Sequence, residues 1–257
     1  MCQLLGMNCN VPTDIWFSFE GFRTRGGQTG DHVDGWGIAF FEGQGYRLFT
    51  DTAASIQSDI AHFVRKHRIR STNVIAHIRK ATHGEVCLEN NHPFVRELWG
   101  RYWLFAHNGD LKDFEPKLNG RFTPVGTTDS EKAFCMIMER FSALSTQQAD
   151  IETLYATLAS LSQSISQSGT FNFILSNGEY LFANCTTDLH YVIRQAPFST
   201  AHLIDKDIMI DFNEVTAPED RVAVIATSPL TDNETWEVMK KDELLCFHNG
   251  KPLPLSA

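Results

Sequence analysis

The chain has 257 residues, of which 42% are hydrophobic and 21% charged, a balance typical of globular proteins rather than of disordered or fibrous chains. Its 31 acidic and 22 basic residues give a net charge of -9, which disfavours non-specific binding to nucleic acid or anionic lipid. No apolar run reaches the ~18 residues of a membrane span, and the first basic residue, Arg23, lies too late for a secretion signal. We therefore expect a soluble, cytoplasmic protein with neither nucleic-acid nor membrane partners.

Apolar patterns in the first half of the chain predict a hairpin, a short helix and two buried strands. The run over 35–49, with a Gly-containing turn in its middle, predicts a β-hairpin. Ser55 is expected to cap a short amphipathic helix. Strands are expected at 73–78 and 102–106, and each is followed by a cluster of polar residues, a place where functional sites are commonly built.

In the second half, helical patterns are followed by short strands. Thr128 and Glu131 have the spacing of a capping box, and apolar residues recur at helical spacing over 151–165. Short strands are then expected at 171–175, 180–183, 191–194, 222–226 and 244–248. This order of strands, helices and strands predicts an α+β layered architecture. Because no repeat or linker interrupts the chain, residues 2–257 are expected to form a single domain.

Cys2 directly follows the initiator methionine. A small second residue usually leads to removal of Met1, which would leave the cysteine with a free α-amino group. A thiol has a pKa near ~8.5 and an α-amino group one near ~7.7–8.0, so the amine could take the proton of its own side chain. Nucleophile and base would then lie on one residue. The alternative is that a cysteine at this position is incidental.

Several short motifs accompany Cys2 along the chain. In order, they are GWGI at 35–38, AHIRKATHG at 76–84, NHP at 91–93, FAHNGD at 105–110, TDSE at 128–131, and ATSPLT at 226–231. Together with Cys2, they resemble the class II glutamine amidotransferases, and in particular the stand-alone members of that family. The class II glutamine amidotransferases are N-terminal-nucleophile (Ntn) hydrolases. The resemblance implies a four-layer αββα sandwich, in which two stacked antiparallel sheets lie between helices.

The resemblance also implies the catalytic residues. Cys2 matches the nucleophile, and Asn108 with Gly109 matches an oxyanion hole, formed by a side-chain amide and a backbone N–H. The tripeptide alone is a weak signal, because Asn-Gly also forms tight turns and His-Asn-Gly recurs at 248–250 in a predicted hairpin. Only the first copy lies between the other motifs in the family's order.

For the substrate, the resemblance implies that Arg79 holds the α-carboxylate, which a guanidinium group can bind bidentately. Asp129 would bind the α-ammonium group. The alternatives are a surface ion pair for Arg79 and a carboxylate favoured by the helix dipole for Asp129. Thr82 and His83 match a loop near the γ-glutamyl group, and Trp36 is expected to line the pocket.

Other features of the motifs are less specific. Lys80 stands where many members of the family have Trp, which weakens any inference about a partner contact made there. The Gly-rich segment 23–34 is either a flexible loop or a lid. Histidines occur in separate motifs without the spacing of metal ligands, so we expect no metal and no cofactor.

The implied reaction is attack of Cys2 on the γ-amide of glutamine, with release of ammonia through a γ-glutamyl thioester. An amidotransferase needs a second site to receive the ammonia, and no phosphate-binding Gly-rich motif is present. A separate synthetase subunit could supply that site. Alternatively, the protein hydrolyses γ-glutamyl amides or peptides other than glutamine. A non-catalytic glutamine-binding module is a third reading, although it would need Arg79 and Asp129 but not Cys2.

Overall fold

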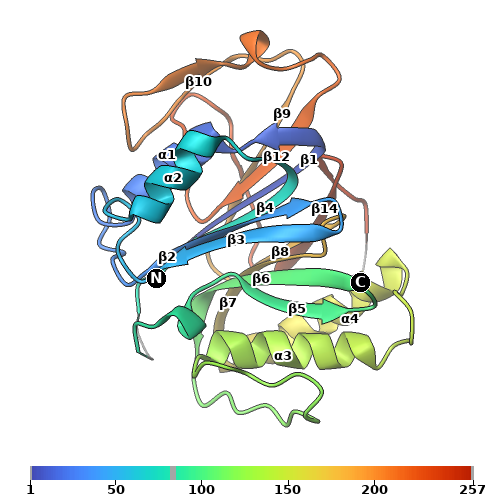
Figure 1. Ribbon diagram of the computed structural model, residues 1–257. Helices are drawn as coiled ribbons and strands as arrows, with labels where there is room; N and C mark the ends of the chain where they lie inside the picture. The colour runs from blue at the N-terminus through green and yellow to red at the C-terminus, as the bar shows by residue number, and fades with distance from the viewer. Residues whose placement is uncertain (1, 82–84, 256–257) are drawn as a thin grey trace.

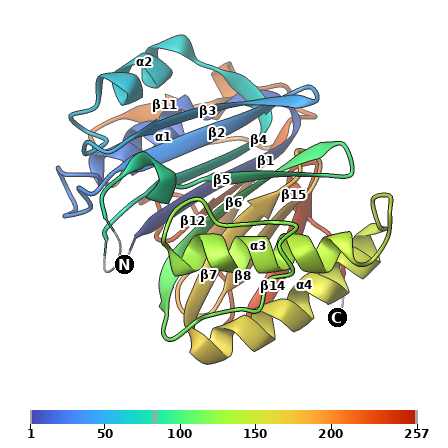
Figure 2. The same ribbon diagram turned by 60° about the horizontal axis from the view of Figure 1, so that its bottom comes forward.

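The structure is a computed structural model that describes residues 2–81 and 85–255. Two antiparallel sheets lie face to face, and helices cover the outer side of each sheet (Figures 1 and 2). Sheet I has the strand order β13-β9-β12-β1-β4-β2-β3, and sheet II has the order β15-β14-β8-β7-β6-β5. This arrangement confirms the α+β fold class and the four-layer αββα sandwich that the resemblance implied.

The strands of sheet I are β1 (Gln3–Asp14), β2 (Trp36–Glu42), β3 (Gly45–Asp51), β4 (Arg70–Ile78), β9 (His190–Gln195), β12 (Arg221–Ala226) and β13 (Glu237–Val238). Those of sheet II are β5 (Phe94–Leu98), β6 (Arg101–Leu111), β7 (Gly169–Ser176), β8 (Leu181–Cys185), β14 (Glu243–His248) and β15 (Lys251–Pro252). A separate two-stranded sheet pairs β10 (Thr200–His202) with β11 (Met209–Asp211).

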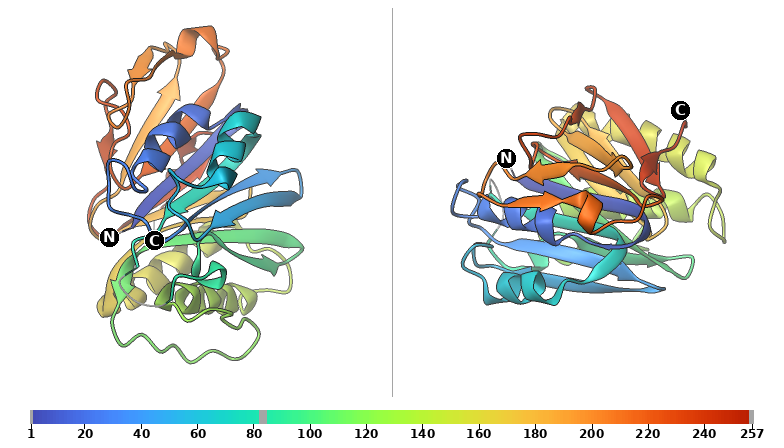
Figure 3. Two further views of the ribbon diagram at one scale, coloured as in Figure 1. Left: turned by 60° about the vertical axis from the view of Figure 1, so that its left-hand side comes forward. Right: turned by 90° about the horizontal axis from the view of Figure 1, so that it is seen from above.

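The helices form the two outer layers. Helices α1 (Trp16–Thr24) and α2 (Asp59–His67) cover sheet I, and α3 (Asp129–Ser142) and α4 (Ile151–Ile165) cover sheet II (Figure 2). Short 3-10 turns occur at Leu88–Asn90, Ser166–Ser168 and Phe212–Glu214. The segment that carries β10 and β11 lies over the outer side of sheet I beside α1 (Figure 3). Within the described ranges, every helix is too short or too polar to cross a bilayer.

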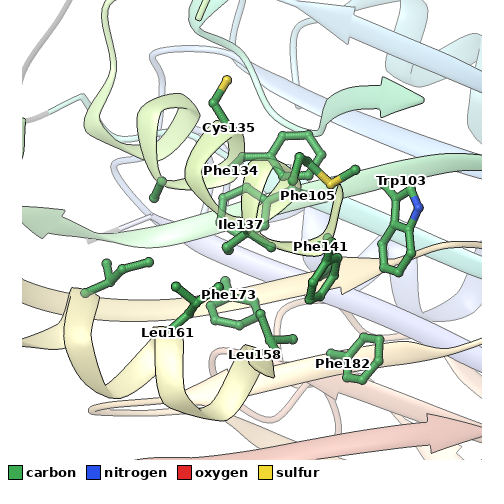
Figure 4. Close-up of a cluster of buried hydrophobic side chains, with 14 of the residues drawn as sticks. Trp103, Phe105, Phe134, Cys135, Ile137, Phe141, Leu158, Leu161, Phe173 and Phe182 are labelled. Atoms are coloured by element: carbon green, nitrogen blue, oxygen red, sulfur yellow. The ribbon is translucent and has the colours of Figure 1, made fainter. Parts of the chain in front are cut away.

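Alternation along the strands separates three cores. In β1, Leu5 packs outward with the layer of α1 and α2, whereas Leu4 packs between the two sheets. A third core lies between sheet II and its helices, where Phe105 stacks on Phe134 with ring centroids 5.1 Å apart (Figure 4). Because both faces of each sheet are buried, a shift of one residue would move the wrong side chains into each core, so the strand register is strongly fixed.

Most predicted elements are present. The hairpin at 35–49 is β2 and β3, the helix at 151–165 is α4, and the later strands correspond to β7, β8, β9, β12 and β14. The predicted cap of α3 is also confirmed, because the Thr128 hydroxyl accepts a hydrogen bond from the Glu131 N–H at 3.2 Å.

Two predictions about element boundaries are wrong. Helix α2 begins at Asp59 and is capped by Ser58, whose hydroxyl accepts from the Ala61 N–H at 3.3 Å. Ser55 instead donates to the Arg23 carbonyl at 2.7 Å. The strand expected at 102–106 continues to Leu111 in β6, so the first His-Asn-Gly lies inside a strand rather than after one.

Candidate active site

Cys2 directly precedes β1, beside the end of β4. Its Sγ accepts a hydrogen bond from the Lys80 N–H at 3.3 Å and lies 3.4 Å from the Lys80 carbonyl, to which the thiol donates. The side chain is partly exposed. Burial raises the pKa of the Cys2 thiol, although the Lys80 N–H and the Arg79 guanidinium act in the opposite direction. The thiol is therefore protonated at neutral pH and needs a base before it can act as a nucleophile.

Arg79 follows the last residue of β4 and is only 4% exposed. Its backbone N–H donates to the Gly35 carbonyl at 2.8 Å, and its Nη1 donates to the Glu85 carbonyl at 2.9 Å. Asp34 lies beside the segment that follows Arg79, because its Oδ2 accepts a hydrogen bond from the Ala81 N–H at 2.8 Å. The Asp34 charge raises the pKa of the Cys2 thiol and the Arg79 charge lowers it, so both charges act on the same thiol.

Asn108 lies in β6 of sheet II and is fully buried. Its Nδ2 donates to the Thr227 hydroxyl at 3.4 Å, and the same hydroxyl accepts from the Leu4 N–H at 2.9 Å. Thr227 therefore connects Asn108 to β1 two residues from Cys2. Among the described residues, the Asn108 Oδ1 has no hydrogen-bond partner.

Gly109 lies where β6 pairs closely with β7. A Cβ atom at this position would lie 1.9 Å from the Thr170 carbonyl oxygen and 2.4 Å from the His107 Nε2. Both distances are far below van der Waals contact, so the strand pair leaves no room for a side chain. Only glycine therefore fits at this position.

Asp129 is the first residue of α3. Its Oδ2 accepts from the Leu111 N–H at 2.8 Å, and its Oδ1 accepts from the Ser130 N–H at 2.8 Å. His107 contacts the same turn, with Nδ1 2.8 Å from the Ser130 hydroxyl and Nε2 3.0 Å from the Thr170 carbonyl. A carbonyl can only accept, so Nε2 carries the proton, and burial lowers the pKa of His107, which keeps the ring neutral.

The sequence pattern of the class II glutamine amidotransferases matches residues 1–257. The chain belongs to this family. A Haemophilus influenzae protein with the provisional name of a glutamine amidotransferase is 51% identical, over 98% of this chain and 86% of its own length. The Escherichia coli protein YafJ, named in the same provisional way, is 50% identical over 98% of this chain and 99% of its own length. The crystal structure of a predicted glutamine amidotransferase from Pseudomonas aeruginosa PA01 matches with a TM-score of 0.78 and 43% sequence identity. The match covers 98% of this chain and 99% of that chain.

In this member of the family, the two His-Asn-Gly tripeptides have different conformations. At the second copy, Asn249 and Gly250 have positive φ values of 52° and 75° and connect β14 to β15 as a hairpin turn. At the first copy, Asn108 pairs with Asn172 in the regular ladder of β6 and β7. The predicted turn is therefore correct for the second copy, and the first copy is not a turn.

The structure does not bring every residue of the predicted site together. Trp36 is 1% exposed and packs against Phe19, in the core between sheet I and its helices. It therefore lines the outer core and not the surroundings of Cys2, which corrects the expectation that it contributes to the pocket. Thr82 and His83, together with Gly84, lie outside the described residues.

Several residues near the site were not predicted from the sequence. Thr227 belongs to the ATSPLT motif, so the motif already contained a signal for it, but its contact with Asn108 depends on how the sheets stack. From the sequence, Asp34 is only the last residue of the Gly-rich segment 23–34, interpreted as either a flexible loop or a lid. Lys80 forms an exposed ion pair with Asp31, with Nζ and Oδ2 2.6 Å apart. Over residues 2–81 and 85–255, no group of three or more His, Cys, Asp and Glu side chains is arranged to hold a metal ion.

Proposed function

We propose that this protein hydrolyses the γ-amide of glutamine with Cys2 as its N-terminal nucleophile, after removal of Met1. The observation that supports this most directly is the position of the Cys2 thiol. It lies on the backbone of Lys80, next to the buried Arg79, while Thr227 connects β1 to Asn108. A nucleophile, a cation and an amide donor thus come from three separate motifs to one end of β1.

The α-amino group of Cys2 would act as the base. The thiol pKa is raised by burial, so the thiolate is scarce at neutral pH. An amine with a pKa of about 7.7–8.0 is suited to accept the thiol proton as the sulfur attacks. In this proposal the amine becomes available only when Met1 is removed, because Met1 would otherwise hold that nitrogen in a peptide bond.

Attack of the sulfur on the γ-carbonyl carbon gives a tetrahedral intermediate with a negatively charged oxygen. An Asn108 Nδ2 hydrogen and the Gly109 N–H would stabilise this oxyanion. When the intermediate collapses, the C–N bond breaks, and the proton held by the amine goes to the nitrogen, which leaves as ammonia. Water then attacks the γ-glutamyl thioester, and the products are glutamate and the regenerated thiol. None of these steps requires a cofactor.

The α-carboxylate and α-ammonium groups of glutamine would be bound by one cation and one anion of the protein. Arg79 is a buried cation near the thiol, suited to an α-carboxylate. Asp129 is a carboxylate held in place by two backbone N–H groups, suited to an α-ammonium group. Thr82 and His83 would face the γ-glutamyl group. All six cysteines are free thiols, which fits a reducing cytoplasm.

Labelling with 6-diazo-5-oxo-L-norleucine tests this proposal. Intact mass should show that Met1 is absent, the adduct should map to Cys2, and ammonia release from glutamine should stop on labelling. Cys2→Ala should abolish both labelling and turnover, whereas Cys87→Ala, at the other partly exposed cysteine, should change neither. A retained Met1, or labelling at another residue, would refute Cys2 as the nucleophile. If Cys2 is labelled but γ-glutamyl amides or peptides are hydrolysed much faster than glutamine, the natural substrate is one of those compounds.

A further inference from the structure

A cavity of about 330 Å³ lies on the outer side of sheet I, far from Cys2. Asp14, at the far end of the 12-residue strand β1, is one of its lining residues. At ~3.3 Å per residue, the strand places Asp14 on the order of 35 Å from Cys2. The reaction proposed above uses no residue of this region, which we call the distal cavity.

The interior of the distal cavity is apolar. Its floor includes Met7 of β1 and Val224 of β12, both buried on the outer face of sheet I. Its walls include Phe17 of α1 and Phe212 from the segment between β9 and β12, whose rings meet edge to face at 5.8 Å. The volume is near the lower end of the range for small-molecule sites, so the interior suits one small aromatic ring or a medium-length acyl chain.

Two exposed arginines lie at the edge of the distal cavity. The Arg68 guanidinium lies over the Trp16 ring, 4.8 Å from its centroid, and the Arg70 Nε donates to the Pro12 carbonyl at 3.0 Å. Within the described ranges, neither guanidinium has a carboxylate oxygen within 4.0 Å. Their terminal nitrogens are therefore available to an incoming anion.

The other charged groups of the distal cavity do not cancel this positive edge. Arg194 is neutralised by Glu234, which it binds through Nε at 2.8 Å and Nη2 at 2.7 Å. Asp14 carries one negative charge, which lies opposite Arg70 in the pairing of β1 with β4 and is favoured by both Arg68 and Arg70, and its Oδ1 accepts from the Trp16 N–H at 2.7 Å. Two arginines against one aspartate leave a local excess of positive charge on a chain whose net charge is -9.

We propose that the distal cavity binds a small amphipathic carboxylate, with its apolar part between Phe17 and Val224 and its carboxylate at Arg68 and Arg70. The apolar interior would exclude free inorganic anions, which gain nothing from it. The two guanidinium groups would select against amines of the same shape. This proposal is independent of the reaction at Cys2, because no residue is shared between the two sites.

Isothermal titration with decanoate, below its micellar concentration, tests the proposal on the full-length protein. We expect saturable binding at one site, and no comparable binding of decylamine, which has the same chain with the opposite charge. Replacing both arginines, Arg68→Ala with Arg70→Ala, should weaken decanoate binding about tenfold or more. Arg101→Ala serves as the control, because Arg101 is a partly exposed arginine of sheet II, paired with Glu179, that does not line the cavity.

Because both arginines are exposed, their replacement should leave the fold intact, which a thermal melt of each variant verifies. A lysine pair, Arg68→Lys with Arg70→Lys, should retain most of the affinity. The proposal is overturned if decanoate does not bind saturably, if decylamine binds equally well, or if the double alanine variant binds decanoate like the parent. Failure of the Cys2 labelling experiment would leave these results unaffected.

Discussion

At the scale of single residues, the base for Cys2 is the most consequential assignment. The thiol pKa is raised by burial, and the described side chains that act on it, Arg79 and Asp34, have opposite effects. The proposed base is therefore the α-amine of the same residue. This assignment makes activity depend on the chain end itself, which can be changed without altering any side chain.

Insertion of one leucine between Met1 and Cys2 should abolish most activity. The bulky second residue would prevent removal of Met1, and the Cys2 nitrogen would remain in a peptide bond that cannot accept a proton. Loss of general-base catalysis typically costs about 10²–10⁴ in rate, and ammonia release from glutamine measures it. If a protease-cleavable tag is used to expose Cys2 as the first residue, activity should return. Full activity of the uncleaved insertion variant would eliminate the amine as base.

Asn108 gives a second residue-scale prediction. Asn108→Ala should lower turnover about 10²–10³-fold, or ~2.7–4 kcal/mol in the barrier, because one donor to the oxyanion is lost. Steady-state kinetics with glutamine would show the loss mainly in kcat. The chain supplies its own control at the second tripeptide, where Asn249→Gly keeps the left-handed turn and should leave kcat unchanged. Equal kinetics of the two variants would argue against an oxyanion role for Asn108.

Some of the proposed site residues have a clearer signal in the sequence than others. Arg79, Asn108 and Asp129 could be selected because each lies in a motif whose order along the chain matches a known family. The position of Trp36 could not be inferred in this way, because the side of the sheet on which a strand residue lies depends on register. Thr227 was missed for a related reason, since its hydroxyl joins two strands that are far apart in sequence.

At the scale of elements, boundary errors have local physical causes. Ser55 and Ser58 both precede an apolar periodic run, and only the backbone conformation decides which hydroxyl reaches a free N–H of the helix. Helix α1 was not predicted because every residue from Phe17 to Thr24 is buried. A helix buried on all sides shows no amphipathic stripe, so periodicity gives no signal.

The close pairing of β6 and β7 leads to an element-scale prediction. Gly109→Ala should destabilise the protein by about 3 kcal/mol or more, because the new Cβ would overlap the Thr170 carbonyl and the strands would have to separate. Urea denaturation measures the free energy of unfolding. Gly45→Ala, in a strand position where the nearest atom to a Cβ is 3.6 Å away, should cost far less. Similar losses in both variants would show that the strand pair can relax around a side chain.

At the scale of the whole molecule, the stacking of the sheets determines both the core and the site. Alternation in the sequence shows which side of a strand is buried, but not which element covers it. The four layers therefore followed from the family resemblance and not from periodicity. Stacking places β4 of sheet I against β6 of sheet II. Arg79, which directly follows β4, and Asn108, which lies in β6, are therefore near each other.

The same stacking buries a pair of histidines whose rings are separated from solvent. His77 of β4 and His92, just before β5, lie with ring centroids 4.2 Å apart, and the ring nitrogens of both are buried. Burial lowers the pKa of His77 to about 3 and lowers the pKa of His92 well below its usual value. Each ring is therefore neutral in the folded protein at pH values where the unfolded chain binds a proton.

Stability should consequently fall as the pH drops below about 6.5, the pKa of an unfolded histidine, toward the folded pKa of about 3. At pH 5, His77 alone should account for a loss of about 2 kcal/mol relative to neutral pH, since each pH unit below 6.5 costs ~1.4 kcal/mol. Carboxylates contribute little to the change in stability between pH 5 and neutral pH, because their pKa values of about 4 in the unfolded chain lie below this range. Urea denaturation at about pH 7.5 and pH 5 measures the difference.

His77→Phe removes the titrating ring while keeping an aromatic side chain, so the variant should lose about 2 kcal/mol less than the parent between the two pH values. His67→Gln, at an exposed position of α2, should keep the parental pH dependence. Neutral His77 inside the stacked sheets would then be a source of acid sensitivity for the whole fold. If the parent is equally stable at both pH values, or if His77→Phe retains the full loss, the ring is protonated in the folded state and the sheets tolerate its charge.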